Sequence, residues 1–294
     1  MFYIGVLLQY TKGEHMKHNK DTTVAEASAT QWHPAFFGSL QIEFEKEADK
    51  LIFESEHQLS TKPMAIDVLI IKKISNEPIK KNIGRIFRKH NIIEYKSPDD
   101  YLSIDDFYKV YGYACFYKYD TSVTNEIKIT ELTISFVCEG YPRKLIHHLE
   151  TTRKYKILKH GNGIYYVEGD IIPIHIIVKK KLSPTENLWL ASLTNSLREK
   201  ETAQKLLRSY NIHKTIPLYR SVMETISKNN ITFFEEDKNM CQTLEDILDR
   251  KTAHEKARVN ALILKLTALD RIDDLVEAAK NPDYQEQLFE EFGL

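Results

Sequence analysis

The chain has 294 residues, of which 42% are hydrophobic, and a formal net charge of −1. This length and composition can bury one large hydrophobic core or two smaller ones. The nearly neutral balance excludes the overall basic character of many nucleic-acid-binding domains. The 3 cysteines lie far apart and form no CxxC pair, which argues against a disulfide framework and fits a reducing cytoplasm.

The N-terminal segment, residues 1–30, is predicted to be a polar and flexible tail. Its opening, MFYIGVLLQY, is apolar but too short to span a bilayer. It also lacks the basic start and the small-residue cleavage site of a signal peptide. We therefore expect a cytoplasmic protein with no membrane partner.

The first half of the folded region is predicted to mix helices and strands. Apolar residues at helical spacing predict a helix over 33–50. The helix predicted over 103–118 has Ser103 at its N-cap and Asp106 three residues later, close to a capping box. Strands are predicted over 51–59, 64–73 and 91–96, with a basic connector over 76–90.

The second half begins with further strands and ends as helix. A strand over 127–139 precedes a basic amphipathic helix over 142–155, and residues 155–181 are typical of strands around a HGNG turn. Ser183, Pro184 and Glu186 predict a helix start with a cap, an N1 proline and an N3 glutamate. From these elements we expect an α/β core over 31–182 and a mostly helical accessory region over 183–294. This region is acidic toward its end, and a homodimer through its helices is one expectation.

Polar residues interrupt two of the predicted apolar strands. Glu94 and Lys96 share one face of their strand because side chains alternate, and Asp67 interrupts the strand before it. If the two strands pair, Asp67 can stand beside Glu94 at one end of the sheet. Two carboxylates in a partly dry cleft repel each other, and a divalent cation with oxygen ligands such as Mg²⁺ relieves that repulsion. A lysine beside such a cation can orient a water or neutralise charge on a phosphate.

The stretches EHQLSTKPMAIDVLIIKK and NIIEYKSPDDYLSIDDFYKVYGYACFYK, with the tail RVNALILKL…RIDDLVEAAKNPDYQEQLFEEFGL, resemble the PD-(D/E)xK nuclease superfamily. The similarity is greatest to its bacterial recombination-promoting nuclease and transposase-like branch. It implies a restriction-endonuclease-like core of order αβββαβ, a central mixed sheet flanked by helices, and divalent-metal-dependent DNA endonuclease activity. One departure is that Ile66 stands where the motif has proline.

The resemblance also implies roles for particular residues. Asp67 and Glu94 would bind Mg²⁺, or Mn²⁺ as its substitute, together with the backbone carbonyl of Tyr95. Lys96 would assist the attacking water or the transition state. Many members add a glutamate from the first helix, for which Glu43, Glu45 and Glu47 are candidates and Glu43 is favoured.

Basic residues around the motif are the candidates for contacting the nucleic-acid backbone. Lys109 on the following helix is one of them. The others between the strands are Lys72, Lys73, Lys80, Lys81, Arg85, Arg88 and Lys89. Arg143, Lys144, Arg153 and Lys154 form the alternative basic surface. The alternative function is a degenerate nuclease fold that binds nucleic acid or another protein without cutting.

Overall fold

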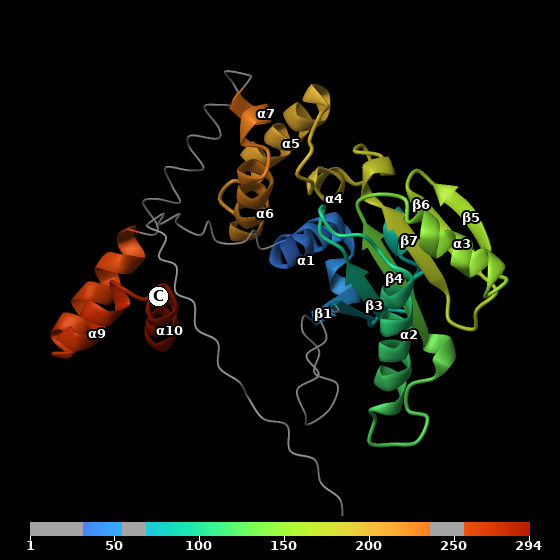
Figure 1. The fold of residues 1–294 in the computed structure, drawn as a ribbon, viewed down its shortest axis with the longest axis horizontal. Coiled ribbons are helices and arrows are strands. Elements are labelled where there is room, and N and C mark those ends of the chain that lie inside the picture. Colours follow the sequence, from blue (N-terminus) through green and yellow to red (C-terminus); the bar gives the residue numbers. More distant parts are fainter. Residues whose placement is uncertain (1–31, 55–68, 236–255) are drawn as a thin grey trace, which may run out of the picture. The chain divides into compact units, whose positions relative to one another are not determined.

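The protein is described by a computed structural model over residues 32–54, 69–235 and 256–294 (Figure 1). Its centre is a 7-stranded mixed sheet of order β1-β2-β3-β4-β7-β6-β5. The strands are β1 Leu51–Glu54, β2 Leu69–Lys73, β3 His90–Tyr95, β4 Leu132–Cys138, β5 Lys156–Gly161, β6 Ile164–Glu168 and β7 Ile174–Val178. The predicted α/β class is confirmed. The predicted tail and Asp67 lie outside the described residues.

Helices cover both faces of the sheet. The α-helices are α1 Trp32–Glu43, α2 Ile104–Tyr119, α3 Arg143–Thr151, α4 Leu188–Ser192, α5 Lys200–His213, α6 Pro217–Lys228, α7 Ile231–Glu235, α9 Ile272–Ala278 and α10 Pro282–Phe292, with helical residues 256–268 before α9. Short 3-10 helices are η1 Glu45–Lys50, η2 Asn82–Gly84, η3 Ile129–Glu131 and η4 Lys179–Lys181. None of the described helices is long and apolar enough to cross a bilayer.

Alternation along each strand divides the core into two layers. Ile92 in β3 packs with α2 and α3 in one hydrophobic cluster. Ile93 and Tyr95, on the opposite face of β3, pack with α1, α4, α5 and α6 in the other. Because the side-chain period of a strand is two residues, Glu94 lies on the α2 side together with Ile92.

Strand directions bring the ends of three strands to one edge. β3 pairs in parallel with β4, and β4 pairs in parallel with β7. The carboxyl ends of these three strands therefore meet at the same edge of the sheet. β2 runs antiparallel to β3, and its first residue, Leu69, pairs with Ile93 close to that edge. We call this the carboxyl edge, and it carries Glu94 and Lys96, Glu139 after β4, and Lys179 after β7.

A buried asparagine fixes the position of β3 in the sheet. Asn91 is fully buried, and its amide nitrogen donates to the carbonyls of Ile71 and Arg88, each at 2.8 Å. Its oxygen accepts from Arg88 N at 2.8 Å and from Thr133 Oγ1 at 2.6 Å. A buried amide satisfied at both ends favours one register over a slipped one, since a slip would leave it unpaired.

Local capping signals were confirmed at α2. Ser103 is the N-cap of α2, and both hydrogen bonds of a capping box with Asp106 are present. The predicted helix over 33–50 differs from the structure, because α1 ends at Glu43 and a 3-10 helix follows over Glu45–Lys50.

The predicted helix start at Ser183 is wrong. Ser183 accepts backbone hydrogen bonds from Glu186 N at 3.1 Å and Asn187 N at 2.9 Å, which closes a turn, and α4 begins only at Leu188. The cap of α4 comes from a distant part of the chain. Glu43 Oε1 accepts from the backbone N–H groups of Trp189 at 2.8 Å and Leu190 at 3.0 Å. A carboxylate on the first N–H groups of a helix satisfies donors that lack an intrahelical partner.

One hydrophobic cluster crosses the predicted boundary at residue 182. It joins Phe36 and Leu40 of α1 with Leu190 of α4, Leu206 of α5 and Val222 of α6. The last helices have a separate cluster of their own, which contains Leu262, Leu266, Ala278, Leu288 and Phe289. The helical character predicted for the C-terminal part is confirmed, while its accessory role stays a prediction.

Candidate active site at the carboxyl edge of the sheet

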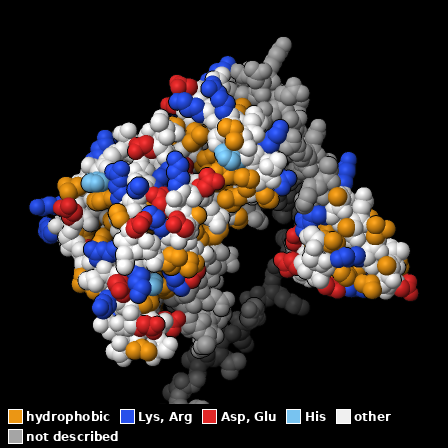
Figure 2. All heavy atoms as spheres, turned by 180° about the vertical axis from the view of Figure 1, so that it is seen from behind, with side chains coloured by type: hydrophobic (Ala, Val, Ile, Leu, Met, Phe, Trp, Pro, Cys, Tyr) orange, Lys and Arg blue, Asp and Glu red, His pale blue; other side chains and the backbone are white. Residues whose placement is uncertain are grey.

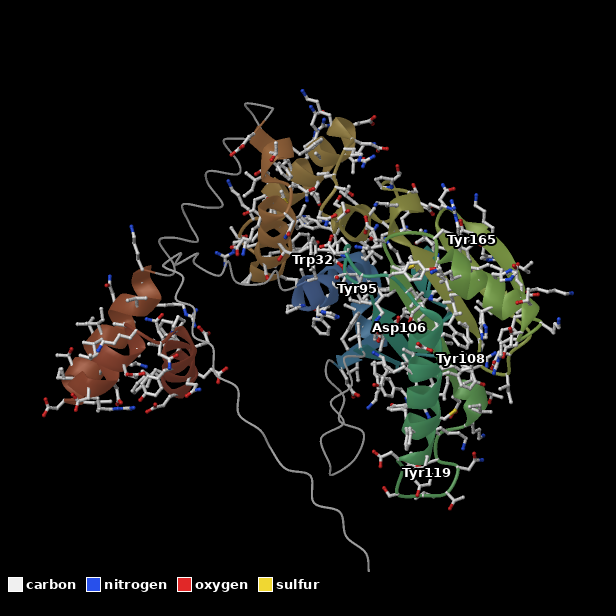
Figure 3. All side chains as sticks on the ribbon, in the orientation of Figure 1. Trp32, Tyr95, Asp106, Tyr108, Tyr119 and Tyr165 are labelled. Atoms are coloured by element: carbon white, nitrogen blue, oxygen red, sulfur yellow. The ribbon has the colours of Figure 1, made fainter. Side chains whose placement is uncertain are left out.

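Glu94 is buried although it carries a charge. All six residues of β3 are buried, and Glu94 is 3% exposed. Lys96 follows on the same face, just past the end of the strand, where its backbone N–H still donates to Val137 O at 2.8 Å. Figure 3 shows Asp106 on α2 and Tyr95 at the end of β3. The predicted shared face of Glu94 and Lys96 is therefore present in the structure.

Two lysines and a second carboxylate surround Glu94. Lys96 Nζ lies 3.1 Å from Glu94 Oε1 and 2.7 Å from Asp106 Oδ1. Lys109 Nζ, from the next turn of α2, lies 3.4 Å from Glu94 Oε1. Because α2 is held at its start by its capping box, Asp106 and Lys109 are presented at a fixed position over the end of β3. Asp106 was predicted only as a capping residue, and its contact with Lys96 was missed.

The ion pairs shift the pKa values of two of these groups. Burial works against ionisation of Asp106, but hydrogen bonds from Lys96 and Ser103 lower its pKa below the ordinary value. Burial also disfavours the charged form of Lys96, but the hydrogen bond to Asp106 and the charge of Glu94 raise its pKa. Lys96 is therefore a cation held between two carboxylates at neutral pH.

One oxygen of Glu94 is available for another ligand. Glu94 Oε2 is buried and has no hydrogen-bond partner within the described part of the chain. A buried carboxylate oxygen without a partner is costly, so it fits a site that gains a cation. The described residues contain no group of three or more His, Cys, Asp or Glu side chains that could hold a metal ion. Glu94 thus fits as one ligand of a metal site whose other predicted carboxylate, Asp67, lies outside the described residues.

Glu43 belongs to a different cluster. Its Oε1 caps α4, as described above, and its Oε2 pairs with the Lys81 ammonium. Lys81 also donates to the Glu186 carbonyl. The neighbouring candidate Glu47 accepts from the backbone N–H groups of Lys80 and Lys81 at 2.9 and 3.1 Å, and Glu45 accepts from Tyr219 Oη at 3.2 Å. The structure gives all three glutamates protein partners outside the Glu94 cluster.

Most of the predicted backbone-binding residues lie away from the carboxyl edge. Lys72 pairs with His90 in the sheet, and Lys73 N donates to Lys89 O, so these residues lie where β3 begins. With about 3.3 Å per strand residue, that position is roughly 20 Å from Lys96. Lys72 forms an ion pair with Glu54 at 2.5 Å, and Lys89 lies 3.9 Å from Glu131.

The remaining basic candidates differ in their surroundings. Arg88 Nη1 donates to Thr130 O at 2.7 Å, near the start of β4, and Arg85 is exposed. On the face seen in Figure 2, Lys and Arg side chains lie mixed with Asp and Glu instead of forming one basic field. Of the residues predicted to bind nucleic acid, the structure brings only Lys109 to Glu94.

The alternative basic surface begins at the carboxyl edge. Arg143 and Lys144 are exposed in the first turn of α3, which follows β4. Tyr101 Oη accepts from Lys144 N at 3.1 Å, which joins this turn to the loop after Lys96. Arg153 lies instead beside Asp170, 3.1 Å from its Oδ2, with its guanidinium 4.9 Å from the Tyr155 ring centroid.

A second buried ionic cluster lies on the other face of the same edge. Lys179 is 1% exposed, and its Nζ lies 3.0 Å from Glu139 Oε2 and 3.3 Å from Tyr95 Oη, and also donates to Leu193 O. Burial lowers the pKa of Lys179, while the nearby Glu139 works in the opposite direction. Sequence reasoning missed this cluster, although Glu139 and Lys179 each follow directly on an apolar strand.

The fold and the cluster at Glu94 define an α/β protein with a buried ionic site at the carboxyl edge of a mixed sheet. Comparison of the chain with protein-family models, with curated proteins and with solved structures finds no match. The residues of the site are therefore the basis for assigning a function.

Proposed function

We propose that this chain is a divalent-metal-dependent endonuclease that hydrolyses DNA phosphodiester bonds at the carboxyl edge of β3. The observation that carries the proposal is the buried Glu94 carboxylate. One of its oxygens has no partner among the described residues, and two lysines lie beside the other oxygen. The element order α1, β1, β2, β3, α2, β4 supports a restriction-endonuclease-like core, because it matches the order that the sequence resemblance implies.

In this proposal Glu94, Asp67 and the Tyr95 carbonyl would hold a Mg²⁺ ion. When bound, the ion would supply Lewis-acid chemistry and lower the pKa of water for the attack on the phosphodiester. Lys96 stabilises the negative charge that develops on the phosphoryl group, and it is kept cationic and oriented by Asp106. Lys109 adds positive charge on the same side of Glu94 and would contact the neighbouring phosphate.

A second candidate function is favoured by one specific observation. Lys96 is held between Glu94 and Asp106 in the manner of a structural ion pair, and under this alternative its only role is to stabilise the fold. In that case the protein would bind nucleic acid or another protein without cutting. The two candidate functions predict different effects of single substitutions on the affinity for metal and on the free energy of unfolding.

Calorimetric titration of Mn²⁺ separates them. The endonuclease proposal expects Glu94→Gln and Asp67→Asn to weaken Mn²⁺ binding at least about tenfold, because each change removes a charged ligand. Lys96→Met should bind Mn²⁺ as tightly as the wild type or more tightly, because lysine is not a ligand and repels the cation. Unchanged Mn²⁺ binding in both carboxylate variants, with a large loss of stability in Lys96→Met, would favour the second candidate.

A further inference from the structure

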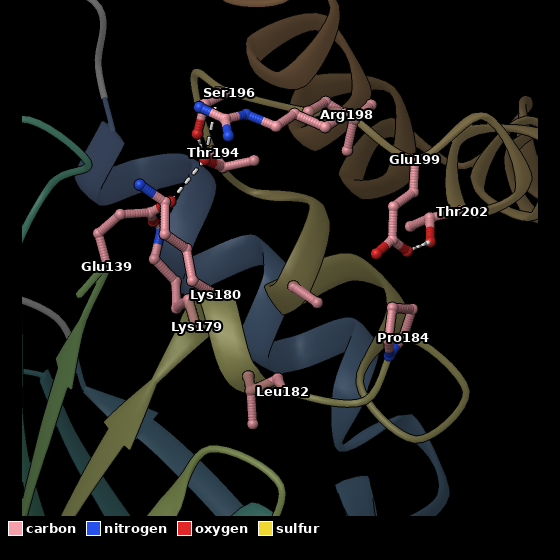
Figure 4. A pocket seen from close by; sticks show the side chains of 12 residues that line it. Glu139, Lys179, Lys180, Leu182, Pro184, Thr194, Ser196, Arg198, Glu199 and Thr202 are labelled. Atoms are coloured by element: carbon pink, nitrogen blue, oxygen red, sulfur yellow. Dashed lines mark hydrogen bonds and ion pairs between the residues drawn. The ribbon is translucent and has the colours of Figure 1, made fainter. Parts of the chain in front are cut away.

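A cavity lies beside the Glu139–Lys179 cluster, at the ends of β4 and β7. Its volume is about 350 Å³, it is open to solvent on one side, and the segment between α4 and α5 together with the start of α5 forms part of its wall (Figure 4). Pockets for small organic ligands range from about 300 to 1,000 Å³. The cavity is therefore too large for a single ion with its water and large enough for a small organic molecule.

One end of the cavity carries excess positive charge. Lys179, Lys180 and Arg198 line this end against the single carboxylate of Glu139, and Thr194 and Ser196 add hydroxyl groups (Figure 4). Lys179 is fully engaged by Glu139, Tyr95 and Leu193, so its amino group is not available to a ligand.

Two of these cations can reach a ligand. Lys180 Nζ lies 3.8 Å from Glu139 Oε1, a loose contact, and its side chain is 56% exposed. Arg198 is exposed, and no ion pair or hydrogen bond joins its guanidinium to another residue in the described part of the chain. Cations placed together with too few carboxylates favour an anion, and a phosphate monoester carries about −1.5 to −2 charges at neutral pH. A guanidinium and an ammonium beside two hydroxyls are suitable donors for its oxygens.

The opposite end of the cavity is an acceptor. Glu199 lies there, and its Oε2 accepts from Thr202 Oγ1 at 3.0 Å (Figure 4). A carboxylate with a remaining oxygen binds hydroxyl or amino groups of a ligand. Leu182 and Pro184 give this part of the wall apolar surface. A ligand that spans the cavity would thus combine a phosphate at one end with hydrogen-bond donors and an apolar body at the other.

We infer that this cavity binds a nucleoside monophosphate group, with its phosphate on Arg198 and Lys180 and a sugar or base donor on Glu199. The group could belong to a free nucleotide or to the end of a nucleic-acid strand, since both present the same chemistry. The inference is independent of the proposed cleavage, because none of these residues belongs to the Glu94 site.

Calorimetric titration of the full chain with each of the four nucleoside 5′-monophosphates tests the inference. At least one of them should bind saturably, and the same nucleoside without its phosphate should bind at least about tenfold more weakly. Arg198→Ala should lower the affinity by about tenfold or more. Arg208→Ala is the matched control, because Arg208 is an exposed arginine on α5 outside the cavity. The Arg208→Ala variant should bind the monophosphate as tightly as the wild type does.

Three results would overturn the inference. They are no saturable binding of any monophosphate, equal binding by Arg198→Ala and the wild type, and inorganic phosphate binding as tightly as the nucleotides. Thermal unfolding of Arg198→Ala should match that of the wild type, which excludes misfolding as the cause of a loss.

A second titration distinguishes the two sources of the ligand. A 5′-phosphorylated and a 5′-hydroxyl oligothymidylate are compared in the wild type and in Arg198→Ala. If the ligand is the end of a strand, the phosphorylated oligothymidylate should bind the wild type more tightly than the hydroxyl form does, and Arg198→Ala should abolish this difference. If the ligand is a free nucleotide, the two oligothymidylates should bind equally, while the mononucleotides still bind.

Discussion

Buried ionisable residues in this protein are held in one protonation state by two different means. Lys96 and Asp106 keep their charges because each is the partner of the other, at 2.7 Å. His175 in β7 is fully buried and has no charged partner among the residues that the structure describes, and burial lowers its pKa to about 3. Its Nε2 lies 2.7 Å from Ser135 Oγ, so a neutral ring is satisfied at that nitrogen. A buried group that has an oppositely charged partner stays charged, and a buried group without one becomes neutral, as expected from the cost of burying an ion.

The state of His175 predicts a pH dependence of stability. The folded protein keeps this ring neutral, while the unfolded chain takes up a proton below its ordinary pKa of about 6.5. The free energy of unfolding should therefore fall as the pH drops from 7 toward 4, with a contribution from this residue of about 2 kcal/mol at pH 5. His175→Gln should lose that contribution, as measured by urea unfolding at both pH values. An identical pH dependence in the two proteins would show that the buried ring is not the cause.

At the scale of elements, α1 and α4 are joined by a single carboxylate. Glu43 ends α1, caps α4 and pairs with Lys81. Rules that use only neighbouring residues in the sequence cannot predict such a contact, because Glu43 and Trp189 are 146 residues apart. The capping box of α2 was predictable since Ser103 and Asp106 are three residues apart. The wrong prediction at Ser183 has the same cause. The residues after Ser183 match a local capping pattern but form a turn, and the helix that follows is capped by the distant Glu43.

Replacement of Glu43 tests whether it is a structural residue or a metal ligand. Glu43→Ala should lower the free energy of unfolding by about 2–4 kcal/mol, because it removes a cap and leaves Lys81 without its carboxylate. Glu43→Gln should cost less, since its oxygen can still accept from Trp189 and Leu190. Asp49→Ala, at an exposed carboxylate nearby, should change stability by less than about 0.5 kcal/mol. Loss of Mn²⁺ affinity without loss of stability in Glu43→Ala would restore the metal-ligand hypothesis.

If the chain binds DNA as proposed, the arrangement of the strands predicts which basic residues make the contact. Arg143 and Lys144 begin α3 at the carboxyl edge, whereas Lys89 lies at the start of β3. Neutralising Arg143 and Lys144 together should weaken DNA binding. The slope of log affinity against log salt concentration should become shallower by the amount expected for about two lost phosphate contacts. Neutralising Arg88 and Lys89 should leave the salt dependence close to that of the wild type. Titrations of a fluorescent DNA duplex at several salt concentrations measure both, and the reverse result would place the DNA at the other edge.

The extent to which the site was predictable follows from how local its contacts are. The shared face of Glu94 and Lys96 was predictable because alternation along a strand requires it. The contact between Lys96 and Asp106 depends on how α2 crosses the end of β3, and no residue pattern specifies that crossing. The Glu139–Lys179 pair was also missed, since it needs the parallel pairing of β4 with β7.

At the scale of the whole molecule, the core and the last helices have separate hydrophobic clusters. The larger cluster needs α4, α5 and α6 to cover α1, while residues 256–294 pack among themselves. We therefore expect the boundary that matters for stability to lie between α7 and residue 256, whereas the boundary predicted from the sequence is at residue 182.

Shortened chains test this boundary. A chain ending at residue 235 should unfold cooperatively, with a free energy of unfolding within about 1 kcal/mol of the corresponding transition in the full chain. A chain ending at residue 182 should fail to fold, because it exposes the apolar side of α1, including Phe36 and Leu40. Far-ultraviolet circular dichroism during urea unfolding gives both answers. A cooperative transition in the shorter chain would show that the sheet and α1 are stable alone.

The central claim is that Glu94 is a ligand in a catalytic metal site. It is tested most directly by the rate at which the purified protein nicks supercoiled plasmid DNA in Mg²⁺. The wild type should nick the plasmid, and Glu94→Gln should be slower by at least about 100-fold, a loss typical of removing a group that stabilises the transition state. Asp105→Asn, which changes an exposed carboxylate next to Asp106, should keep the wild-type rate. Equal Mg²⁺-dependent nicking by Glu94→Gln and the wild type would contradict the claim.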